Sequence, residues 1–432
     1  MNKKRDYRAL FNGIEVPIKL ENGDTIIPIN FDNAATTPPL KKVDSFVYDN
    51  ILMYGSVGRG GHKSSYCTQA YEVSRQEILS FFNIMDENNY TVIYVKNTTE
   101  GINLLARVLC DQRMDKVLAT RMEHHANDLP WRMVANMFYV DVDDSGKFSL
   151  EAMEEKLIQA QGTIKYVTVT AASNVTGYVN PVHQIAELAH KYGAMIIVDA
   201  AQLVAHRSIT IKGTGKNDAI DFLVFSGHKM YAPFGSGVVI GLKEVFNKKN
   251  PYLVGGGAVT AVFDDDVYWK EAPQKNEAGT PNFLGAMSIV AAMVVLREIG
   301  FEAISNHEES LKRKLLNGLS DLPGVVLYGD MNDKDRLGVI PFNVEGITHV
   351  QMAHLLTERR GIAVRNGCFC AQPYVTRLLG ISNQERYHYM LNLNLAAPGM
   401  IRASIGLYNT EEEVDEFLNT VAYIIKHTPI KK

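Results

Sequence analysis

The sequence predicts a mostly parallel α/β fold for most of the chain. Short apolar segments rich in β-branched residues, such as residues 164–170 and 195–200, have the composition of buried strands. They alternate with helical patterns such as residues 183–193, which end at the helix-stopping Gly193. Strands interleaved with helices favour a parallel sheet covered by helices. With 432 residues and 46% hydrophobic composition, the chain can bury a substantial core, and its length favours two or three domains.

The elements fall into three parts along the chain. An N-terminal segment, residues 1–30, is expected to pack on a small C-terminal domain. Residues 31–300 form the large α/β domain, and we expect residues 277–301 to be one long helix that joins it to the next part. Residues 301–432 form a compact α+β domain. The strands expected in the large domain are residues 91–95, 117–120, 138–142, 164–170, 195–200, 222–227 and 237–241, and those in the small domain are residues 325–329, 339–344 and 362–366.

A lysine follows one of these strands at a position suited to covalent chemistry. Lys229 lies just beyond an apolar strand and ahead of a glycine-rich turn. Burial at a strand end lowers the pKa of an amine and makes it a better nucleophile toward carbonyl groups, as in Schiff-base lysines. Ser226 and His228 flank it and could hold an anion. The alternative is a solvated turn, because Ser-x-x-Lys is a common short pattern.

An aspartate ends the strand that precedes this one. Asp199 lies at the carboxyl end of an apolar strand, which is the edge where open α/β sheets bind ligands, although it could also cap the next helix. A carboxylate together with a strand-end lysine suits pyridoxal 5'-phosphate (PLP), which needs an amine for its aldehyde and a carboxylate for its protonated ring nitrogen. Gln202 could then hydrogen-bond the ring hydroxyl.

A phosphate site is expected at the start of a helix after residues 91–95. Thr98 and Thr99 lie where free backbone N–H groups, the helix dipole and two hydroxyls make an anion pocket; an ordinary threonine N-cap is the alternative. His124 or His125 could stack on a flat ring. A metal pair is disfavoured because adjacent side chains diverge.

Composition excludes several other classes of function. A net charge of −4 with interspersed signs gives no basic field, so we expect no nucleic-acid partner. No apolar run reaches a membrane-spanning length, and the basic N-terminus has no continuous apolar stretch after it, so we expect no membrane association. Four cysteines in so long a chain do not make a disulfide framework, which favours a reducing, cytoplasmic location.

The chain resembles the class V aminotransferases of PLP fold type I, and within them the cysteine desulfurase and selenocysteine lyase group. The resemblance runs from about Phe31 to Thr410, with similar gaps between motifs. It implies the family's fold, with a large PLP-binding domain and a small α+β domain. The motifs that carry it are FDNAATTPP, NTTEGIN, EHHAN, SNVTG, VDAAQ, FSGHKMYAPFGSG, EAGTPN, VRNGCFCAQP and IRASIGLYNT, in the family's order.

Roles for individual residues follow from the resemblance. Lys229 looks like the PLP lysine, Asp199 like the partner of the ring nitrogen and Gln202 like the contact to the ring oxygen. The resemblance also implies a homodimer in which Thr280 reaches the phosphate of the neighbouring subunit's cofactor. The other matches are His124, stacked on the ring; Thr98, Thr99, Ser226 and His228, at the phosphate; and Asn174 and Arg402, at the substrate carboxylate.

Two cysteines distinguish this chain within the family. Cys370, directly before Ala-Gln-Pro, matches the desulfurase nucleophile, whereas Gly-Cys-Phe-Cys resembles molybdenum-cofactor sulfurases. An extended backbone would place Cys368 on the same face, where it could accept or shield a persulfide; two buried apolar residues are the alternative. No second cysteine pair accompanies them, so we expect no metal. Cys67 and Cys110 are expected to be structural.

These assignments predict a cysteine desulfurase that forms alanine and a persulfide on Cys370. Lys229 would remove the α-proton of cysteine or selenocysteine, and the Cys370 thiolate would attack the substrate sulfur. An ordinary thiol is only a few per cent thiolate at neutral pH, so Arg365 and His125 are candidate positive neighbours, Arg365 also lying near the substrate.

One departure keeps a second class of function open. Residues 376–400 are longer than the resemblance predicts and could be a lid, a docking surface for a sulfur-acceptor protein, or a sign of another substrate. The alternative is a class V PLP enzyme without sulfur transfer, such as an aminotransferase, an epimerase or a C–S lyase. A non-catalytic protein on this fold would bind no PLP.

Overall fold

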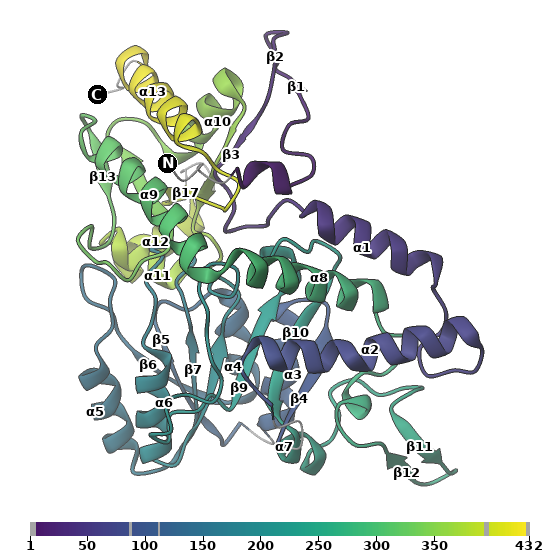
Figure 1. Cartoon of the computed structure of the whole chain (residues 1–432). Coiled ribbons are helices and arrows are strands. Elements are labelled where there is room, and N and C mark those ends of the chain that lie inside the picture. The colour runs from purple at the N-terminus through teal and green to yellow at the C-terminus, as the bar shows by residue number, and fades with distance from the viewer. Residues whose placement is uncertain (1–5, 86–88, 111–112, 393–396, 429–432) are drawn as a thin grey trace.

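The computed structural model describes residues 6–85, 89–110, 113–392 and 397–428. Its centre is a seven-stranded sheet in the order β4-β10-β9-β8-β7-β5-β6, in which β10 is antiparallel to both neighbours and the other pairs are parallel. All seven expected strands are present, and the prediction of a mostly parallel α/β fold is confirmed (Figure 1). The strands are β4 (Tyr90–Val95), β5 (Lys116–Thr120), β6 (Asn136–Val140), β7 (Ile164–Thr170), β8 (Met195–Asp199), β9 (Phe222–Ser226) and β10 (Gly237–Leu242).

Helices cover both faces of this sheet. Along β8, Ile196 and Val198 face one apolar core and Ile197 faces the other, as the alternation of side chains requires. The first core includes residues of α2 (His62–Phe81), α5 (Leu150–Ala160), α6 (Val182–Lys191) and α8 (Phe283–Ile299), with α1 (Lys41–Leu52) packed on α8. The second includes residues of α3 (Thr98–Leu109), α4 (Leu129–Val134) and α7 (Lys243–Lys248). Burial on both faces explains the continuous apolar strands.

The long helix expected at residues 277–301 begins later and ends with a bend. Asn282 caps α8, its side chain accepting a hydrogen bond from the Gly285 N–H at 3.0 Å. Glu277 lies outside the helix, separated from it by Gly279, with φ of 93°, and by Pro281, and its carboxylate pairs with Arg75 at 2.8 Å. At Gly300, with φ of 86°, the chain turns by 80° into α9 (Phe301–Ser320). In the described part of the chain no single helix is long and apolar enough to cross a membrane, and only this bent pair passes such a test jointly.

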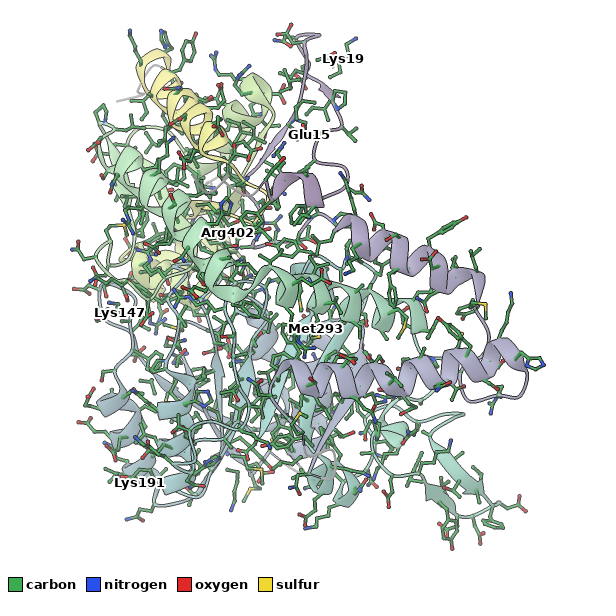
Figure 2. All side chains as sticks on the ribbon, in the orientation of Figure 1. Glu15, Lys19, Lys147, Lys191, Met293 and Arg402 are labelled. Atoms are coloured by element: carbon green, nitrogen blue, oxygen red, sulfur yellow. The ribbon has the colours of Figure 1, made fainter. Side chains whose placement is uncertain are left out.

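A smaller sheet forms the second layer system above the first. Its order is β13-β14-β17-β16, all antiparallel, and α9 and α10 (His349–Arg360) pack on it with α13 (Glu411–His427) (Figure 1). In Figure 2, Arg402 lies where the two parts meet, Met293 lies inside the large part, and Lys191 projects from its periphery. The strands are β13 (Val325–Leu327), β14 (Val339–Val344), β16 (Arg365–Gly367) and β17 (Met400–Ser404).

The N-terminal segment contacts both parts. The strand expected at residues 362–366 is divided: β15 (Ile362–Ala363) pairs in parallel with β3 (Ile29–Asn30), and β16 joins the small sheet. Phe31 packs in the small core, whereas Phe11 packs against Tyr231 of the large one. The boundaries at residues 30 and 300 stay predictions. Two short hairpins, β1 (Ile18–Lys19) with β2 (Thr25–Ile26) and β11 (Val259–Val262) with β12 (Val267–Trp269), project from the body (Figure 1).

Residues 376–400 belong to the connection between β16 and β17, two neighbouring strands of the small sheet. α11 (Gln372–Leu378) is followed by α12 (Asn383–Leu391), which begins with a capping box between Ser382 and Glu385. No residue of α12 is buried. The remainder of the segment lies partly outside the described residues.

Candidate active site

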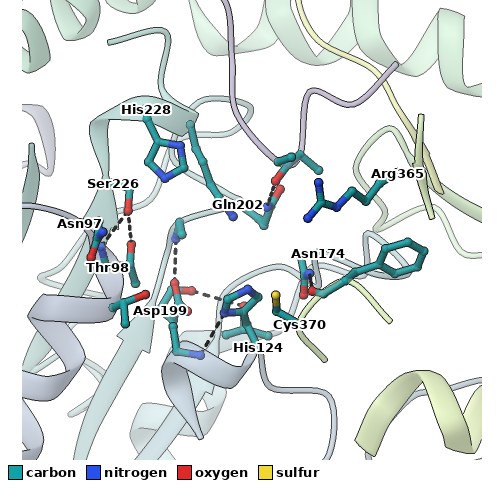
Figure 3. Close-up of a pocket in the computed structure, with 18 of the residues that line it drawn as sticks. Asn97, Thr98, His124, Asn174, Asp199, Gln202, Ser226, His228, Arg365 and Cys370 are labelled. Carbon is teal, nitrogen blue, oxygen red and sulfur yellow. Dashed lines mark hydrogen bonds between the residues drawn. The ribbon is translucent and has the colours of Figure 1, made fainter. Parts of the chain in front are cut away.

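A cavity lies where the carboxyl ends of the strands meet the small domain. Its lining residues come from the ends of β7, β8 and β9, from the start of α3, and from the C-terminal part of the chain (Figure 3). This is the edge at which parallel sheets collect ligand-binding side chains. The structure brings together these expected residues: Thr98, Thr99, His124, Asn174, Asp199, Gln202, Ser226, His228, Lys229, Arg365, Cys370 and Arg402.

Lys229 lies one turn beyond the end of β9. The strand ends at Ser226, and the single turn Gly227–Lys229 carries the amine into the cavity. Burial lowers the pKa of Lys229 to about 8, although the Asp199 carboxylate opposes this shift. At pH 7 about a tenth of the amine is therefore neutral and nucleophilic, far more than for an ordinary lysine.

Asp199 faces the same space from the end of β8. It is buried, and its Oδ1 accepts a hydrogen bond from the Ala201 N–H at 3.0 Å. Burial raises the pKa of Asp199, while the Ala201 hydrogen bond and Lys229 act in the opposite direction. A cationic ring nitrogen would restore the ionised form. Gln202 is oriented by its Nε2, which donates to the Ala34 carbonyl at 2.7 Å.

The start of α3 makes a polar cradle at one end of the cavity. The Thr98 N–H donates to Ser226 Oγ at 2.7 Å, and the two hydroxyls are also 2.7 Å apart. Asn97, which sequence reasoning missed, caps the helix by accepting from the Glu100 N–H at 3.0 Å. The Asn-Thr pair before a helical pattern could have identified it. A helix N-terminus with hydroxyls suits a phosphate group.

Two histidines of the cavity are neutral. Burial, with the Lys229 charge nearby, lowers the pKa of His124 to about 3 and that of His228 to about 4. Nδ1 of His124 accepts a hydrogen bond from the Ala126 N–H at 3.0 Å, which fixes the ring. A neutral, oriented imidazole suits stacking on a flat cationic ring. His228 contributes an uncharged ring, not a positive charge, with Nδ1 3.2 Å from Thr36 Oγ1.

A guanidinium closes the opposite end of the cavity. Arg402, in β17, is buried and donates to the Asn174 carbonyl at 2.9 Å and to Asp32 Oδ1 at 2.8 Å. Its Nε is buried without a hydrogen-bond partner. Arg365 lies opposite it across the β16–β17 pair and lines the same cavity. Asp32 is a partner that sequence reasoning missed.

The two thiols do not lie on an extended backbone, so that prediction is wrong. Phe369 and Cys370 have φ of 52° and 54°, and the Ala371 N–H closes a tight turn on the Cys368 carbonyl at 2.8 Å. Asn174 Nδ2 donates to the Phe369 carbonyl at 2.8 Å. The turn directs Cys370 to the cavity, whereas Cys368 is half-buried in a separate apolar cluster. Burial raises the pKa of Cys368.

His125 does not act as a positive neighbour of the thiol. Burial lowers its pKa, and its Nε2 accepts a hydrogen bond from the Gln372 N–H at 3.2 Å. A ring nitrogen used as an acceptor carries no proton. The sequence-based expectation is therefore wrong for His125, while Arg365 keeps its place in the cavity.

Thr280 lies away from this cavity. It lines a second one together with Arg59 and Arg75, beside the start of α8. Cys67 and Cys110 are buried. Among the described residues, no group of three or more His, Cys, Asp and Glu side chains could hold a metal ion.

The residues of the cavity fit PLP. An amine of lowered pKa, a buried carboxylate, a neutral imidazole and a helix N-terminus with hydroxyls correspond to its aldehyde, ring nitrogen, ring face and phosphate. The unpartnered Nε of Arg402 leaves a donor for an anionic group.

Comparisons with known proteins agree with this fit. The model of the family "Aminotransferase class-V" matches residues 29–417. A probable cysteine desulfurase from Synechocystis sp. is 35% identical over 94% of this chain and 92% of its own length. A cysteine desulfurase from Haloferax volcanii is 33% identical over 93% of this chain and 90% of its own length.

Solved structures give the same result. The apo structure of a cysteine desulfurase from Thermococcus onnurineus NA1 has a TM-score of 0.82 and 34% identity, covering 92% of this chain and 95% of that one. A cysteine desulfurase from Escherichia coli, in an S-sulfonic acid form, has a TM-score of 0.81 and 27% identity, covering 98% of this chain and 99% of that one. The protein belongs to the class-V aminotransferase family and is a PLP-dependent enzyme of fold type I.

Proposed function

We propose that this enzyme is a cysteine desulfurase that converts L-cysteine to L-alanine and leaves a persulfide on Cys370. The observation that carries the proposal is the position of the Cys370 thiol, which lines the same cavity as Lys229 and Arg402. Relatives named as cysteine desulfurases match more than nine-tenths of the chain. Selenocysteine is a second candidate substrate, because its selenium would occupy the place of the sulfur.

The substrate carboxylate is held by Arg402. The guanidinium is anchored by Asp32 and the Asn174 carbonyl, so its orientation is set before the substrate arrives. Its free Nε and the neighbouring Arg365 offer further positive donors. An amino acid bound in this way would have its α-carbon between Arg402 and Lys229.

The cofactor site is divided among the strand ends. Asp199 would pair with the ring nitrogen, Gln202 would contact the ring oxygen and His124 would stack on the ring; all three line the cavity. PLP, when bound, supplies an electron sink for the substrate α-carbon. The phosphate would be held by Thr98, Thr99, Ser226 and His228, all of which line the cavity. Thr98, Ser226 and His228 gather at one end of it (Figure 3).

Lys229 and Cys370 carry out the steps that the protein itself performs. Lys229 would bind the cofactor aldehyde and, once the substrate amine had released it, would remove the α-proton; a pKa of about 8 suits both roles. The Cys370 thiolate forms a bond to the substrate sulfur while the Cβ–S bond of the substrate breaks. The electron pair of that bond stays with the β-carbon, which gains one proton to become the methyl group of alanine, and the α-carbon regains the proton that it lost. L-cysteine and the enzyme thiol thus give alanine and the enzyme persulfide.

The proposal extends to a homodimer in which Thr280 contacts the phosphate of the neighbouring subunit's cofactor. Thr280 lies outside the cavity that would hold the cofactor of its own subunit. The segments next to its second cavity carry exposed apolar side chains, with Tyr48 64%, Leu52 56% and Val254 70% exposed, as expected for a surface covered by a partner. A cytoplasmic sulfur-acceptor protein would receive the persulfide from the exposed Cys370.

A PLP enzyme without sulfur transfer is the second candidate, because the long segment after Cys370 adds an exposed helix, α12, to the chain. One experiment separates the two. The purified protein is supplied with PLP and cysteine, and alanine and sulfide are measured separately. Cys370→Ser should lower alanine formation by roughly a thousandfold or more while leaving the absorbance of bound PLP unchanged, because only the nucleophile is lost.

Matched variants complete this test. Cys368→Ser should retain most of the activity, since its side chain lies outside the cavity. After one turnover, mass spectrometry should find the added sulfur on Cys370. Full alanine formation by the double serine variant would assign the enzyme to the lyase or aminotransferase class.

A further inference from the structure

The turn that carries Cys370 is held by the chain segment next to the cofactor-stacking histidine. The His125 N–H donates to the Cys370 carbonyl at 2.6 Å. The His125 side chain returns to the same turn, where Nε2 accepts from the Gln372 N–H at 3.2 Å. One residue therefore contacts the backbone at two points that follow the Cys370 side chain, the Cys370 carbonyl and the Gln372 N–H.

These two hydrogen bonds act where the backbone is least favourable. Phe369 and Cys370 both have left-handed φ values, which side chains other than glycine rarely adopt. Such a conformation persists only where the surroundings determine it. The Asn174 amide holds the carbonyl of Phe369, and His125 holds the next carbonyl and the N–H at the start of α11.

The histidine is not placed to exchange protons with the thiol. Its Nε2 is occupied as an acceptor of a backbone N–H, and burial lowers its pKa, so the imidazole is neutral. What it contributes is direction. The neighbouring His124 is fixed by the Ala126 N–H, so the ring-stacking side chain and the thiol are set by adjacent residues of one short segment.

We propose that His125 is a positioning residue that aligns the Cys370 thiol with the substrate sulfur by holding the Cys370 carbonyl and the Gln372 N–H. It touches neither substrate nor cofactor, and it sets the direction of the Cβ–Sγ bond relative to Arg402 and Lys229. This inference rests on the proposed function, because it concerns the thiol that accepts the sulfur.

The test uses full-length enzyme that carries Cys368→Ser, so that Cys370 is the accessible thiol; Cys67 and Cys110 are buried. Three variants are compared at one position. His125→Gln can still present an oxygen acceptor at the distance of Nε2, His125→Asn is one bond too short, and His125→Leu has no acceptor.

Two readouts are combined. The first readout is kcat and KM for alanine formation. His125→Asn and His125→Leu should lower kcat by about ten- to a hundredfold with little change in KM, because misalignment of about 1 Å has effects of that size. The second is the ratio of the rates at which iodoacetate and iodoacetamide alkylate Cys370 without cysteine present. Iodoacetate is an anion that Arg402 attracts, so the ratio reports alignment of the thiol with the cavity, and the fraction of thiolate cancels.

In His125→Asn and His125→Leu, the alkylation ratio should fall by at least about threefold, toward that of Arg402→Ala. The ratio of His125→Gln should stay within about twofold of the parent's ratio. Bound PLP should keep its absorbance in all three. Should His125→Leu fail to fold, the comparison of His125→Gln with His125→Asn decides the outcome. Equal alkylation ratios in His125→Gln and His125→Asn, or a loss of kcat at an unchanged alkylation ratio, would overturn the proposal. If the parent enzyme makes no alanine yet the ratios differ as expected, the proposed function fails and the positioning role stands.

Discussion

The floor of the cavity rests on the ends of regular strands, whereas the thiol on its rim rests on a left-handed turn. Asp199 and Ser226 are the last residues of β8 and β9, and each is buried. Cys370 is exposed, and its backbone depends on contacts from distant segments of the chain. Two residues with positive φ cost about 1–3 kcal/mol each, which the surrounding hydrogen bonds must offset.

The difference shows that burial controls the residues of the floor, whereas backbone geometry controls the thiol on the rim. On the floor, low solvent exposure shifts pKa values, lowering that of Lys229 and raising that of Asp199. On the rim, geometry is what matters, because an exposed thiol depends on direction more than on burial. Perturbing the floor should change the chemistry of the cofactor, and perturbing the rim should change alignment.

The largest effect on the floor is expected from Asp199→Asn. Turnover should fall by roughly a thousandfold while bound PLP still absorbs visible light, because a neutral partner no longer stabilises the protonated ring nitrogen. Alanine formation and absorbance spectra measure the two separately. Normal turnover in this variant would contradict the role of Asp199 as the partner of the ring nitrogen.

The next prediction compares two arginines of the rim. Arg402→Ala should weaken transition-state binding by about 2–4 kcal/mol, because it removes a buried guanidinium and leaves Asp32 without its ion pair. Arg365→Ala is the control, since that side chain is exposed and should have a smaller effect on kcat/KM. Equal effects would mean that burial does not separate the two.

A pH profile tests the burial of Lys229. Enzyme stripped of PLP should rebind it faster as pH rises, because only the neutral amine attacks the aldehyde. Below the folded pKa of about 8 the rate should increase about tenfold per pH unit, and above it the rate should level off. An amine with the ordinary value of 10.5 would instead keep accelerating to pH 10 and would contradict a buried floor.

The smallest effect concerns the anchoring of the rim. Tyr374 in α11 is buried, and its hydroxyl donates to the Gly146 carbonyl at 2.7 Å. Tyr374→Phe should lower the free energy of unfolding by about 1–2 kcal/mol, measured from the urea midpoint, because the carbonyl loses its partner. Tyr387→Phe, at a side chain that is 64% exposed, should leave the midpoint unchanged.

Local patterns were sufficient for the floor and insufficient for the rim. Lys229, Asp199 and Thr98 could be placed because each follows an apolar strand, and a strand end has a known position in a parallel sheet. The Arg402–Asp32 pair joins residues 370 positions apart, so no local pattern contains it. The helix expected from Glu277 starts at Phe283 for a local reason, because Gly279, Pro281 and the Asn282 cap come before it.

The sequence by itself determined where the strands lie along the chain and the chemistry of the residues at their ends, because apolar periodicity and strand-end position are local properties. Only the tertiary structure decided how Cys370 is presented. Residues 368–370 are compatible with an extended strand, and they form a turn because Asn174 and His125, brought near by folding, hold their carbonyls. Left-handed backbone at two non-glycine residues has an unfavourable local energy, so it can arise only from contacts that the local sequence does not contain.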